Sequence, residues 1–443
     1  MVSRIHFVNR YFFPDHSATS QILSGVVFDL AERGYDVRVT TGYQLYENAS
    51  AQLPRHETIR GVDVTRVATT RFGRTSLAGR LFDYLTFYVA AATHLLLTLR
   101  RGDIVIAKTD PPLLSLLIVP VAKLKGAICV NWLQDVFPEV ATAVNLGGRP
   151  MRLLARPLKA LRNLSLRAAD QNVAIGEVMV DRFAGQGMDR ARFTVIPNWA
   201  DPDVIPAHPP GASELRREWG LEDRFVVAYS GNLGRVHEVD TIIDALENLN
   251  RSRPSIAAAN RISFLFIGSG AQRRFLEREV ARRQLENVVI KPYQPQERLA
   301  DALAVADVHL VSLKPDLEGY VVPSKVYGVM AAGRPTLFVG APHGEVARLI
   351  ARHKCGVTIA AGASGRLANT ILDLSQRPEL CEEMGAAARK AFAASYTKRA
   401  SSLSWHSMIS ELQISSTVGG TAGPAAANDR PLSSGAARDS AFN

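Results

Sequence analysis

The chain has 443 residues, of which 47% are hydrophobic, and a formal net charge of +10 at pH 7. This length exceeds what one ordinary hydrophobic core organises, so we expect two domains. The excess of basic residues favours an anionic partner, such as a nucleotide or an acidic lipid. Nucleic acid is not an expected partner, because aromatic residues make up only 7% and no basic and aromatic residues alternate along a predicted strand.

The three cysteines, Cys129, Cys355 and Cys381, lie far apart in the sequence. Their odd number and wide spacing fit neither a disulfide framework nor a metal site, and favour a reducing compartment. No paired acids or histidine cluster follows a predicted strand, so we expect no metal and no other cofactor. The first residues, RIHFVNRYFFP, enter a strand pattern directly and do not resemble a signal peptide. A cytoplasmic protein is therefore expected.

The first half of the chain alternates apolar strands with helices. Residues 19–34 have helical spacing, with Ile22, Val26 and Leu30 on one face and a glycine as the stop signal. The predicted strands are residues 4–9, 36–42, 103–112, 127–135, 171–176 and 193–198. Apolar strands separated by helices are typical of a parallel sheet that is covered on both faces.

One helical stretch in this half, residues 81–99, is long enough to cross a bilayer. It contains Asp83 and His94, and charge inside a membrane span is costly. We therefore expect a buried or interfacial helix rather than a membrane span.

The alternating pattern restarts after residues 201–213, which are rich in proline and are typical of a linker. The predicted strands of the second half are residues 225–234, 262–270, 287–293, 308–313 and 335–340. The sequence thus predicts an α/β protein with two doubly wound, Rossmann-like domains. Ligands of such sheets bind at the carboxyl ends of the strands, so two facing domains place one cleft between them.

The end of the chain changes in composition. A predicted helix near residues 390–412 carries Phe392, Tyr396, Leu403 and Trp405, which is apolar enough to pack on another surface. Residues 414–443 consist largely of Ser, Gly, Ala and Pro, and burial of so little apolar area does not offset the entropy of ordering them. We expect this tail to be disordered.

Residues 318–335, EGYVVPSKVYGVMAAGRP, place an acid and a lysine around a predicted helix start. Pro323 and Ser324 are favourable first residues for a helix that runs to Ala332. A helix N-terminus carries partial positive charge, and Lys325 adds a full charge there, which together suit a phosphate. The alternative interpretation is a solvated surface lysine.

Two glycine-containing turns follow predicted strands of the second half. In SGNLGRVH, Gly231 and Gly234 permit close backbone approach, while Arg235 and His237 offer charge or hydrogen bonds. IGSG follows the next strand. Each turn alone is also compatible with an ordinary strand-to-helix connection. Together with the helix start above, the turns predict a site for a nucleotide diphosphate.

Residues 149–167, RPMRLLARPLKALRNLSLR, contain no acidic residue. At about 100° per residue, the basic side chains form one stripe of a helix and the leucines lie on another side. The basic stripe comprises Arg149, Arg152, Arg156, Lys159 and Arg167, and the leucines are Leu153, Leu154, Leu158, Leu161 and Leu164. Such a helix either lies on an anionic membrane or exposes a solvated stripe above leucines that face the core.

Several motifs occur in a fixed order along residues 4–410: FPDHSAT, LAERGYDVRVTTG, TDPPLL, QDVFPE, VIPNWADPD, YSGNLGRVHEVD, FIGSG and PSKVYGVMAAGRP. As a set, they resemble the retaining glycosyltransferases of family 4, in particular the colanic-acid and O-antigen branch. The resemblance implies a GT-B fold. It implies an acceptor-binding domain in residues 1–200, a nucleotide-sugar domain in residues 201–389, and a helix in residues 390–413 that crosses back to the first domain.

The resemblance also implies a donor site in the second domain. Glu318 matches a glutamate that is implied to contact the sugar, whereas Gly328 stands where the family has a ribose-binding glutamate. The expected donor-binding residues are Gly231, Asn232, Arg235, His237, Gly268, Gly270, Tyr293, Val322 and Ser324.

Two positions that carry cations in the family, both implied to bind the donor diphosphate, are occupied here by Asn232 and His237. We expect Lys325, together with Arg235 and His237, to restore the missing positive charge. Lys325 is accordingly an expected catalytic residue, with Glu318.

On the acceptor side, the loop LQDVFPEVA follows a strand and is implied to lie near the donor sugar and the acceptor. We expect Asp135 to be catalytic or to bind sugar, and the alternative is a helix cap. The expected acceptor-binding residues are His16, Ser17, Thr19 and Glu139.

The sequence therefore predicts transfer of a sugar, with retention, from a UDP- or GDP-linked donor to a lipid-diphosphate-linked saccharide of cell-surface polysaccharide assembly. The protein is expected to associate peripherally with the anionic inner face of the cytoplasmic membrane, through Arg149, Arg152, Arg156 and Lys159. One alternative is a sugar-nucleotide epimerase of the same fold, which needs no membrane. Another is a non-catalytic nucleotide-sugar-binding protein, against which Glu318 and Lys325 argue.

Overall fold

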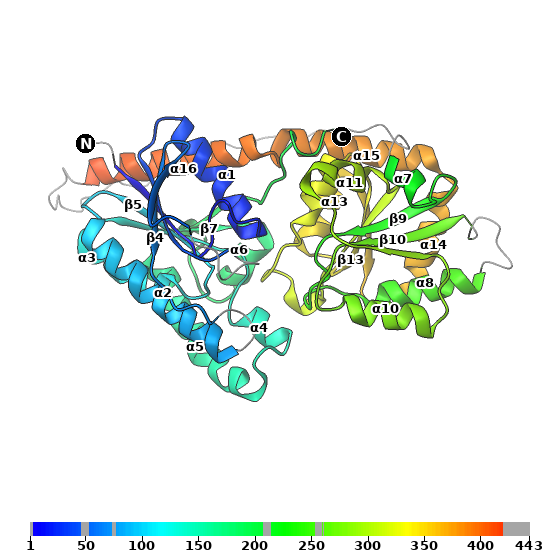
Figure 1. Ribbon diagram of the computed structural model, residues 1–443, viewed down its shortest axis with the longest axis horizontal. Coiled ribbons are helices and arrows are strands. Elements are labelled where there is room, and N and C mark those ends of the chain that lie inside the picture. The colour runs from blue at the N-terminus through cyan, green and yellow to red at the C-terminus, as the bar shows by residue number, and fades with distance from the viewer. Residues whose placement is uncertain are drawn as a thin grey trace, which may run out of the picture.

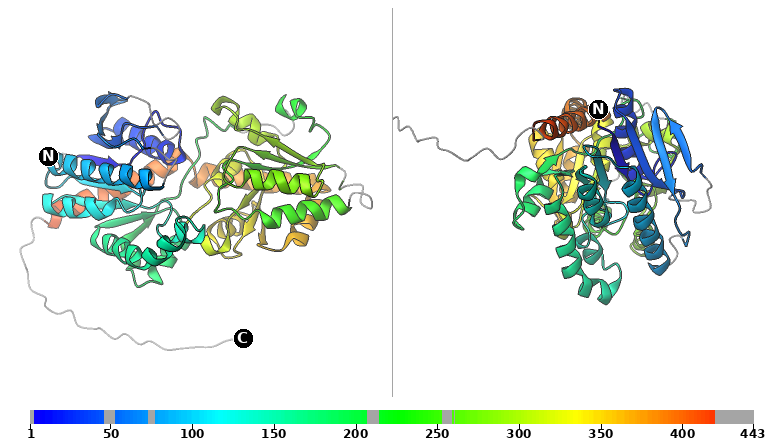
Figure 2. Two further views of the ribbon diagram at one scale, coloured as in Figure 1. Left: turned by 60° about the horizontal axis from the view of Figure 1, so that its bottom comes forward. Right: turned by 90° about the vertical axis from the view of Figure 1, so that its left-hand side faces the viewer.

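The computed structural model describes residues 3–45, 53–72, 77–206, 214–252, 259 and 261–419. Two α/β domains lie side by side, and a helix runs from the second back to the first (Figure 1). Each domain has its own sheet with helices on both faces (Figures 1 and 2). The predicted architecture of two doubly wound domains is confirmed. The predicted linker, residues 201–213, lies partly outside the described residues.

The N-terminal domain contains an eight-stranded sheet with the order β3-β4-β2-β1-β5-β6-β7-β8. Its strands are β1 (Ile5–Val8), β2 (Val37–Gly42), β3 (His56–Ile59), β4 (Val62–Val67), β5 (Ile104–Lys108), β6 (Ile128–Trp132), β7 (Gln171–Ala174) and β8 (Phe193–Val195). Its helices are α1 (Ala18–Glu32), α2 (Leu77–Thr98), α3 (Ser115–Lys125), α4 (Glu139–Ala143), α5 (Gly148–Ala168) and α6 (Glu177–Ala184).

The strands β1 and β5 are buried along their whole length, which matches their mostly apolar sequences, and the buried polar side chains are His6 and Lys108. All pairs are parallel except β3 with β4. The sequence analysis did not predict this antiparallel hairpin, because β3 is an edge strand whose side chains are exposed or half-buried. Strand order reverses between β1 and β5, and this places a crevice at their carboxyl ends.

The C-terminal domain contains a six-stranded parallel sheet with the order β11-β10-β9-β12-β13-β14. Its strands are β9 (Phe225–Ser230), β10 (Ile262–Ile267), β11 (Val288–Lys291), β12 (Val308–Ser312), β13 (Thr336–Gly340) and β14 (Gly356–Ala360). Its helices are α7 (Glu214–Glu218), α8 (Asp240–Ser252), α10 (Arg273–Arg282), α11 (Leu299–Ala304), α12 (Lys325–Ala331), α13 (Glu345–His353), α14 (Ser364–Ser375) and α15 (Pro378–Ser395). The strand order reverses between β9 and β12.

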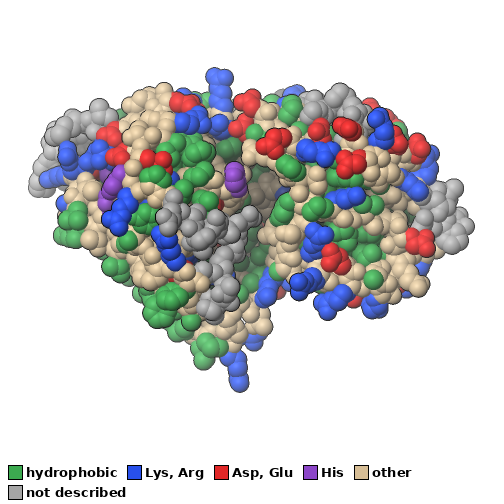
Figure 3. All heavy atoms as spheres, in the orientation of Figure 1, with side chains coloured by type: hydrophobic (Ala, Val, Ile, Leu, Met, Phe, Trp, Pro, Cys, Tyr) green, Lys and Arg blue, Asp and Glu red, His purple; other side chains and the backbone are tan. Residues whose placement is uncertain are grey.

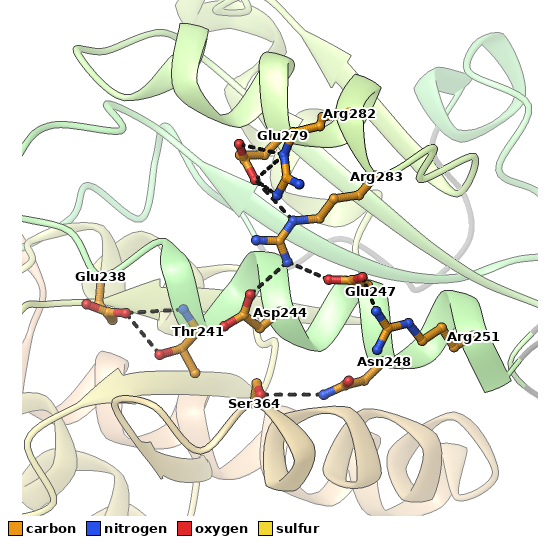
Figure 4. A network of polar contacts seen from close by, with 10 residues as sticks. All are labelled: Glu238, Thr241, Asp244, Glu247, Asn248, Arg251, Glu279, Arg282, Arg283 and Ser364. Carbon is orange, nitrogen blue, oxygen red and sulfur yellow. Dashed lines mark hydrogen bonds and ion pairs between the residues drawn. The ribbon is translucent and has the colours of Figure 1, made fainter.

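A charged network fixes two outer helices of this domain (Figure 4). Arg283, just after α10, donates to the carboxylates of Asp244 and Glu247 on α8, both at 2.7 Å. At the other end of α8, the Glu238 carboxylate accepts a hydrogen bond from the Thr241 hydroxyl at 2.9 Å. These polar residues therefore hold the scaffold together rather than face the cleft.

The last helix, α16 (Lys398–Gly419), leaves the C-terminal domain and packs on α1 of the N-terminal domain. Trp405 is fully buried there, with its ring centre 4.5 Å from that of Trp132 and 6.3 Å from that of Phe7. The expected crossing helix exists with different bounds, because the helical conformation is interrupted between Ser395, the end of α15, and Lys398, the start of α16. The helix also continues six residues beyond 413, so the expected disorder is wrong for residues 414–419. Residues 420–443 lie outside the described residues.

We predict that Trp405→Ala destabilises the protein by about 3–5 kcal/mol, because it leaves a cavity between α16 and the sheet of the other domain. Chemical denaturation followed by far-ultraviolet circular dichroism measures this loss, because that signal does not depend on the fluorescence of the removed tryptophan. Leu403→Ala is the matched control on the same helix, since Leu403 is 43% exposed and its truncation should change stability by less than about 0.5 kcal/mol. Equal effects of both variants would contradict the docking role of Trp405.

Candidate active site

The surface is hollowed between the two domains (Figure 3). At the base of this cleft the backbone N–H of Val136 donates to the carbonyl of Tyr320 at 2.9 Å. Arg182 on α6 donates to the carbonyl of Glu318 at 2.8 Å and lies over the Tyr320 ring at 4.5 Å. These contacts bring the loop after β6, which holds Asp135, against the loop that holds Glu318.

The side chain of Lys325 lies at the carboxyl end of β9. Its Nζ donates to the hydroxyl of Tyr229 and to the carbonyl of Asn232, the latter at 3.3 Å, and lies 3.8 Å from the centre of the Tyr229 ring. Desolvation lowers the pKa of Lys325 well below its usual value. Across the described residues, no carboxylate lies within ion-pair distance of Nζ. A cation held by neutral groups in this way favours an anionic ligand.

The two glycine turns stack on each other beside Lys325. Gly268 and Gly270 have positive φ angles of 126° and 136°, and a Cβ at either would collide with a backbone carbonyl of the turn after β9. Gly231, with φ of 120°, lies under the Lys325 side chain, since a Cβ there would be 3.8 Å from Cε. The glycines therefore permit the close packing that forms the floor around Nζ.

The expected charge on His237 is absent. His237 is buried, and its Nδ1–H donates to the carbonyl of Ser312 at 2.7 Å. Desolvation, with a smaller contribution from the nearby charge of Lys325, lowers the pKa of His237 to about 3. It is therefore neutral at physiological pH. Arg235 and Asn232 are exposed on the same turn. Positive charge at this turn thus comes from Arg235 and from the adjacent Lys325, and not from His237, which corrects the prediction for His237.

Three further donor-site residues have different surroundings. Tyr293 is 53% exposed and stands next to the Gly268 turn, where an aromatic ring can stack on a base. Val322 is buried against apolar residues of the N-terminal domain, so it joins the two domains instead of facing a ligand. Ser324 precedes α12 without a side-chain capping bond. That helix starts at Lys325 and has seven residues, which is shorter than predicted.

The Glu318 carboxylate is 6% exposed and lies at the start of α13. Its Oε1 accepts the backbone N–H of Glu345 at 2.7 Å, and Oε2 is buried without a hydrogen-bond partner within the described ranges. Burial raises the pKa of Glu318. One oxygen is thus held by a helix start, and the other is an acceptor without a partner, enclosed beside Gly344.

Gly328 occupies a position that does not suit a ribose-binding carboxylate. A Cβ there would lie 3.7 Å from Ile205 and 3.8 Å from Leu303, both apolar and buried. A glutamate side chain would therefore start out in apolar surroundings, and the glycine is consistent with this packing.

On the facing side of the cleft, two carboxyl groups follow neighbouring parallel strands, Asp110 after β5 and Asp135 after β6. Water reaches Asp135, but the enclosing protein partly desolvates it and, together with Asp110, raises its pKa to about 6. Burial also raises the pKa of Asp110, which accepts a hydrogen bond from the Thr19 hydroxyl at 3.3 Å. The alternative interpretation of Asp135 as a helix cap is wrong, because no helix starts at this residue.

Sequence reasoning missed Asp110 and Lys108. The Nζ of Lys108 is buried 4.0 Å above the Trp132 ring and donates to the carbonyl of Thr19 at 2.8 Å, and desolvation lowers its pKa to about 7. The available signal was the polar stretch KTD directly after a buried strand, on the same sheet edge as Asp135. Lys108 and Asp110 thus connect the loop of Thr19 to the cleft.

The remaining acceptor candidates divide into two groups. His16 is exposed near the cleft loops, and Ser17 donates to the carboxylate of Asp15 just before α1. Glu139 instead pairs with Arg162 at 2.6 Å and lies 3.8 Å from Lys159. Its carboxylate is used to hold α4 on α5, which contradicts the predicted contact of Glu139 with acceptor.

Two Rossmann-like domains that face each other across a cleft and are joined by a crossing helix define the GT-B fold. Solved structures share this fold. Sucrose-phosphate synthase from Thermosynechococcus elongatus superimposes with a TM-score of 0.71 at 14% identity, over 93% of this chain and all of that one. HepE from Anabaena superimposes with a TM-score of 0.68 at 15% identity, over 92% of this chain and all of that one. WaaG, a glycosyltransferase involved in lipopolysaccharide biosynthesis, superimposes with a TM-score of 0.63 at 17% identity, over 90% of this chain and 99% of that one.

Family models identify both halves. Residues 21–199 match the glycosyl transferase 4-like domain, residues 212–391 match glycosyl transferases group 1, and the chain belongs to this family of glycosyltransferases. WcaI of Escherichia coli, a putative colanic acid biosynthesis glycosyl transferase, is 25% identical over 76% of this chain and 83% of its own length. WbjE of Pseudomonas aeruginosa, a probable glycosyltransferase, is 28% identical over 57% of this chain, and the match spans 60% of WbjE. The predicted family resemblance is confirmed.

We predict that Asp135 must be ionised for turnover. Its pKa is raised to about 6, so the carboxylate dominates above pH 6 and kcat/KM should fall as the pH decreases through that value. Asp135→Asn should lower kcat/KM at pH 7.5 by about 100-fold and remove the acidic limb of the pH profile. Asp223→Asn, at an exposed position, is the matched control. If the acidic limb of the kcat/KM profile near pH 6 were unchanged in Asp135→Asn, the titration would belong to another group.

Proposed function

We propose that this glycosyltransferase moves a sugar, with retention, from a UDP- or GDP-linked donor to a lipid-diphosphate-linked saccharide of cell-surface polysaccharide assembly. The observation that carries the proposal is the Lys325 ammonium, which neutral groups hold at the strand ends of the C-terminal domain. The name of WcaI, a putative colanic acid biosynthesis glycosyl transferase, supports the polysaccharide assignment. The HepE structures with UDP and UDP-glucose support a nucleotide donor.

The chemistry follows from where charge develops. Breaking the bond between the sugar and the diphosphate leaves positive charge at the anomeric carbon and negative charge on the leaving phosphate. Lys325 and Arg235 stabilise that phosphate in a cleft with little water. The leaving phosphate oxygen accepts the proton of the acceptor hydroxyl, which attacks from the same face and so retains configuration. Oε2 of Glu318 and the Asp135 carboxylate bind sugar hydroxyl groups on opposite sides of the cleft.

The direct test is a screen of purified protein against UDP- and GDP-sugars, with and without lipid-diphosphate saccharides. Sugar transfer that requires the lipid acceptor supports the proposal. Epimerisation of free donor without acceptor would show the epimerase alternative, and donor binding without any turnover would show a binding protein.

We predict that Lys325→Ala lowers turnover by about 100-fold, because a preorganised charge next to the leaving phosphate is lost. Binding of UDP or GDP to the wild type should also take up a proton, since the lowered pKa of Lys325 rises beside a diphosphate, and affinity should therefore fall as pH increases. Steady-state kinetics and calorimetry in buffers of different ionisation enthalpy measure both effects.

Arg274→Ala is the control for loss of a cation, since Arg274 is exposed on α10. It should leave both kinetics and proton uptake unchanged. A folded Lys325→Ala variant with near-normal turnover would remove Lys325 from the mechanism.

We predict that the transfer needs no divalent metal. In the part of the chain that the structure describes, no group of three His, Cys, Asp or Glu side chains could hold a metal ion, and cations of the protein face the diphosphate. Activity should persist within about twofold in EDTA. Loss of activity in EDTA that magnesium or manganese restores would show a metal requirement.

A further inference from the structure

Three helices, α2, α3 and α5, form one outer face of the N-terminal domain, with α3 in contact with both others (Figures 1 and 2). Most of the exposed large hydrophobic side chains of the described chain lie on this face, where Figure 3 shows hydrophobic side chains over α2 and α5. They are Leu81, Phe82, Leu85, Val89, Leu96 and Leu97 on α2, Leu117 and Leu124 on α3, and Leu153, Leu154, Leu161 and Leu164 on α5. A monomeric soluble protein seldom exposes so many on one surface.

Helix α2 is apolar on two opposite sides. Phe87, Ala91 and Leu95 are fully buried at a spacing of four residues, whereas Leu85 and Val89 are 48% and 62% exposed. By length and composition, the segment Ala78–Thr98 could cross a membrane, yet only 22% of its most apolar window is buried. Its apolar character is therefore not explained by the core.

Asp83 shows that α2 stays attached to the domain. It is fully buried, pairs with Arg10 at 3.2 Å, and accepts hydrogen bonds from the Thr70 hydroxyl at 2.7 Å and the Phe72 backbone at 3.0 Å. Insertion across a bilayer would break these bonds and leave a charge in hydrocarbon. The expected buried or interfacial helix is thus fixed on one side and open on the other.

Helix α5 has the opposite orientation to that of an ordinary amphipathic core helix. Its buried residues are Arg162, Ser165 and Leu166, while Leu153 is 80% exposed and Leu164 is 61% exposed. The alternative in which the leucines face the core is therefore wrong. The helix presents leucines to solvent beside its basic stripe.

The charge on this face has one sign. Besides Arg162, which is buried and pairs with Glu139, the three helices carry eight basic side chains, Arg80, Lys123, Lys125, Arg149, Arg152, Arg156, Lys159 and Arg167. Their one acidic residue is Asp83, which is buried. A second copy of the chain would oppose basic to basic, whereas an anionic lipid surface offers both complementary charge and an apolar interior.

We propose that the face formed by α2, α3 and α5 docks on an anionic phospholipid bilayer, with its exposed leucine, valine and phenylalanine side chains inserted among the acyl chains. The helices lie in the plane of the interface, and the basic side chains contact lipid phosphates. Insertion by α2 goes beyond attraction to the basic stripe of α5 alone. This places the protein on the inner face of the cytoplasmic membrane, with the acceptor-side loops next to the lipid surface.

The inference rests on the surface itself and adds a partner to the proposed function. Helix α4 links the face to the site, because it follows Asp135, is held on α5 by the pair of Glu139 with Arg162, and contacts the segment before Glu318. A saccharide attached to lipid would therefore enter the cleft from the docked side.

Flotation with vesicles of phosphatidylethanolamine and phosphatidylglycerol tests the proposal without donor or acceptor. Two variants separate the contributions, one in which Leu85, Val89, Leu153 and Leu154 become Gln, and one in which Arg149, Arg152 and Arg156 become Gln. The charge variant should partition about 100-fold more weakly at low salt. The apolar variant should lose the binding that the wild type keeps in 0.5 M salt, at least about tenfold, because insertion is not screened.

Arg274→Gln with Arg278→Gln on α10 is the charge control, and Leu403→Gln on α16 is the apolar control, both at exposed positions. Neither should change partitioning. Equal melting temperatures and nucleotide affinities of all variants would show that they fold. The fluorescence emission of a polarity-sensitive dye attached to Leu154→Cys should shift to the blue on vesicle binding. The dye should label this position selectively, because the three native cysteines are buried.

The proposal is overturned if wild type does not float with anionic vesicles at low salt, or if the apolar variant binds as wild type does in high salt. It is also overturned if sedimentation shows a dimer that only the apolar variant dissociates. Vesicle binding without sugar transfer would support the docking face and contradict the proposed function. Sugar transfer to the lipid acceptor without vesicle binding would support the proposed function and contradict the docking face.

Discussion

The structure depends on a double crossing of the chain between its two sheets. The backbone N–H of Ala200, where the chain leaves the first domain, donates to Tyr396 at 3.2 Å, and the N–H of Lys398, where it returns, donates to Ala200 at 3.3 Å. Because both crossings meet at one place, the two chain connections between the domains lie together at one edge. Burial of Trp405 in the far domain then keeps the strand ends of the two sheets facing each other. The cleft is a consequence of that arrangement.

Within the cleft, the ionisable groups are held away from their preferred charge states. Desolvation lowers the pKa of Lys325 and raises those of Glu318 and Asp135, so that the empty cleft disfavours the charged form of each group. A bound diphosphate favours the charged form of Lys325, and sugar hydroxyl groups favour the ionised carboxylates. Ligand binding is therefore expected to restore the charges that burial disfavours, and proton exchange should accompany it.

The two domains differ in what their outer surfaces expose. In the C-terminal domain, the helices α8 and α10 carry charges of both signs, which pair across the helices (Figure 4). In the N-terminal domain, α2 and α5 carry basic and apolar side chains with no exposed acid. The first surface is typical of a protein face in water, and the second is suited to a lipid interface. This division matches the proposed donor, which diffuses in solution, and the proposed acceptor, which is anchored in a membrane.

The sequence by itself determined the two parallel sheets, because strands such as β5 and β10 are short continuous apolar runs that only a buried sheet accommodates. It also located Lys325 and the glycine turns, since local backbone requirements are written in adjacent residues. The tertiary structure alone decided which charges persist. His237 is neutral because burial, with the nearby Lys325, lowers its pKa, and Asp110 lies near Asp135 because the two strands that precede them are neighbours in the sheet. The exposed leucines of α5 follow the same reasoning: periodicity divides a helix into faces, but only packing against distant residues decides which face is covered.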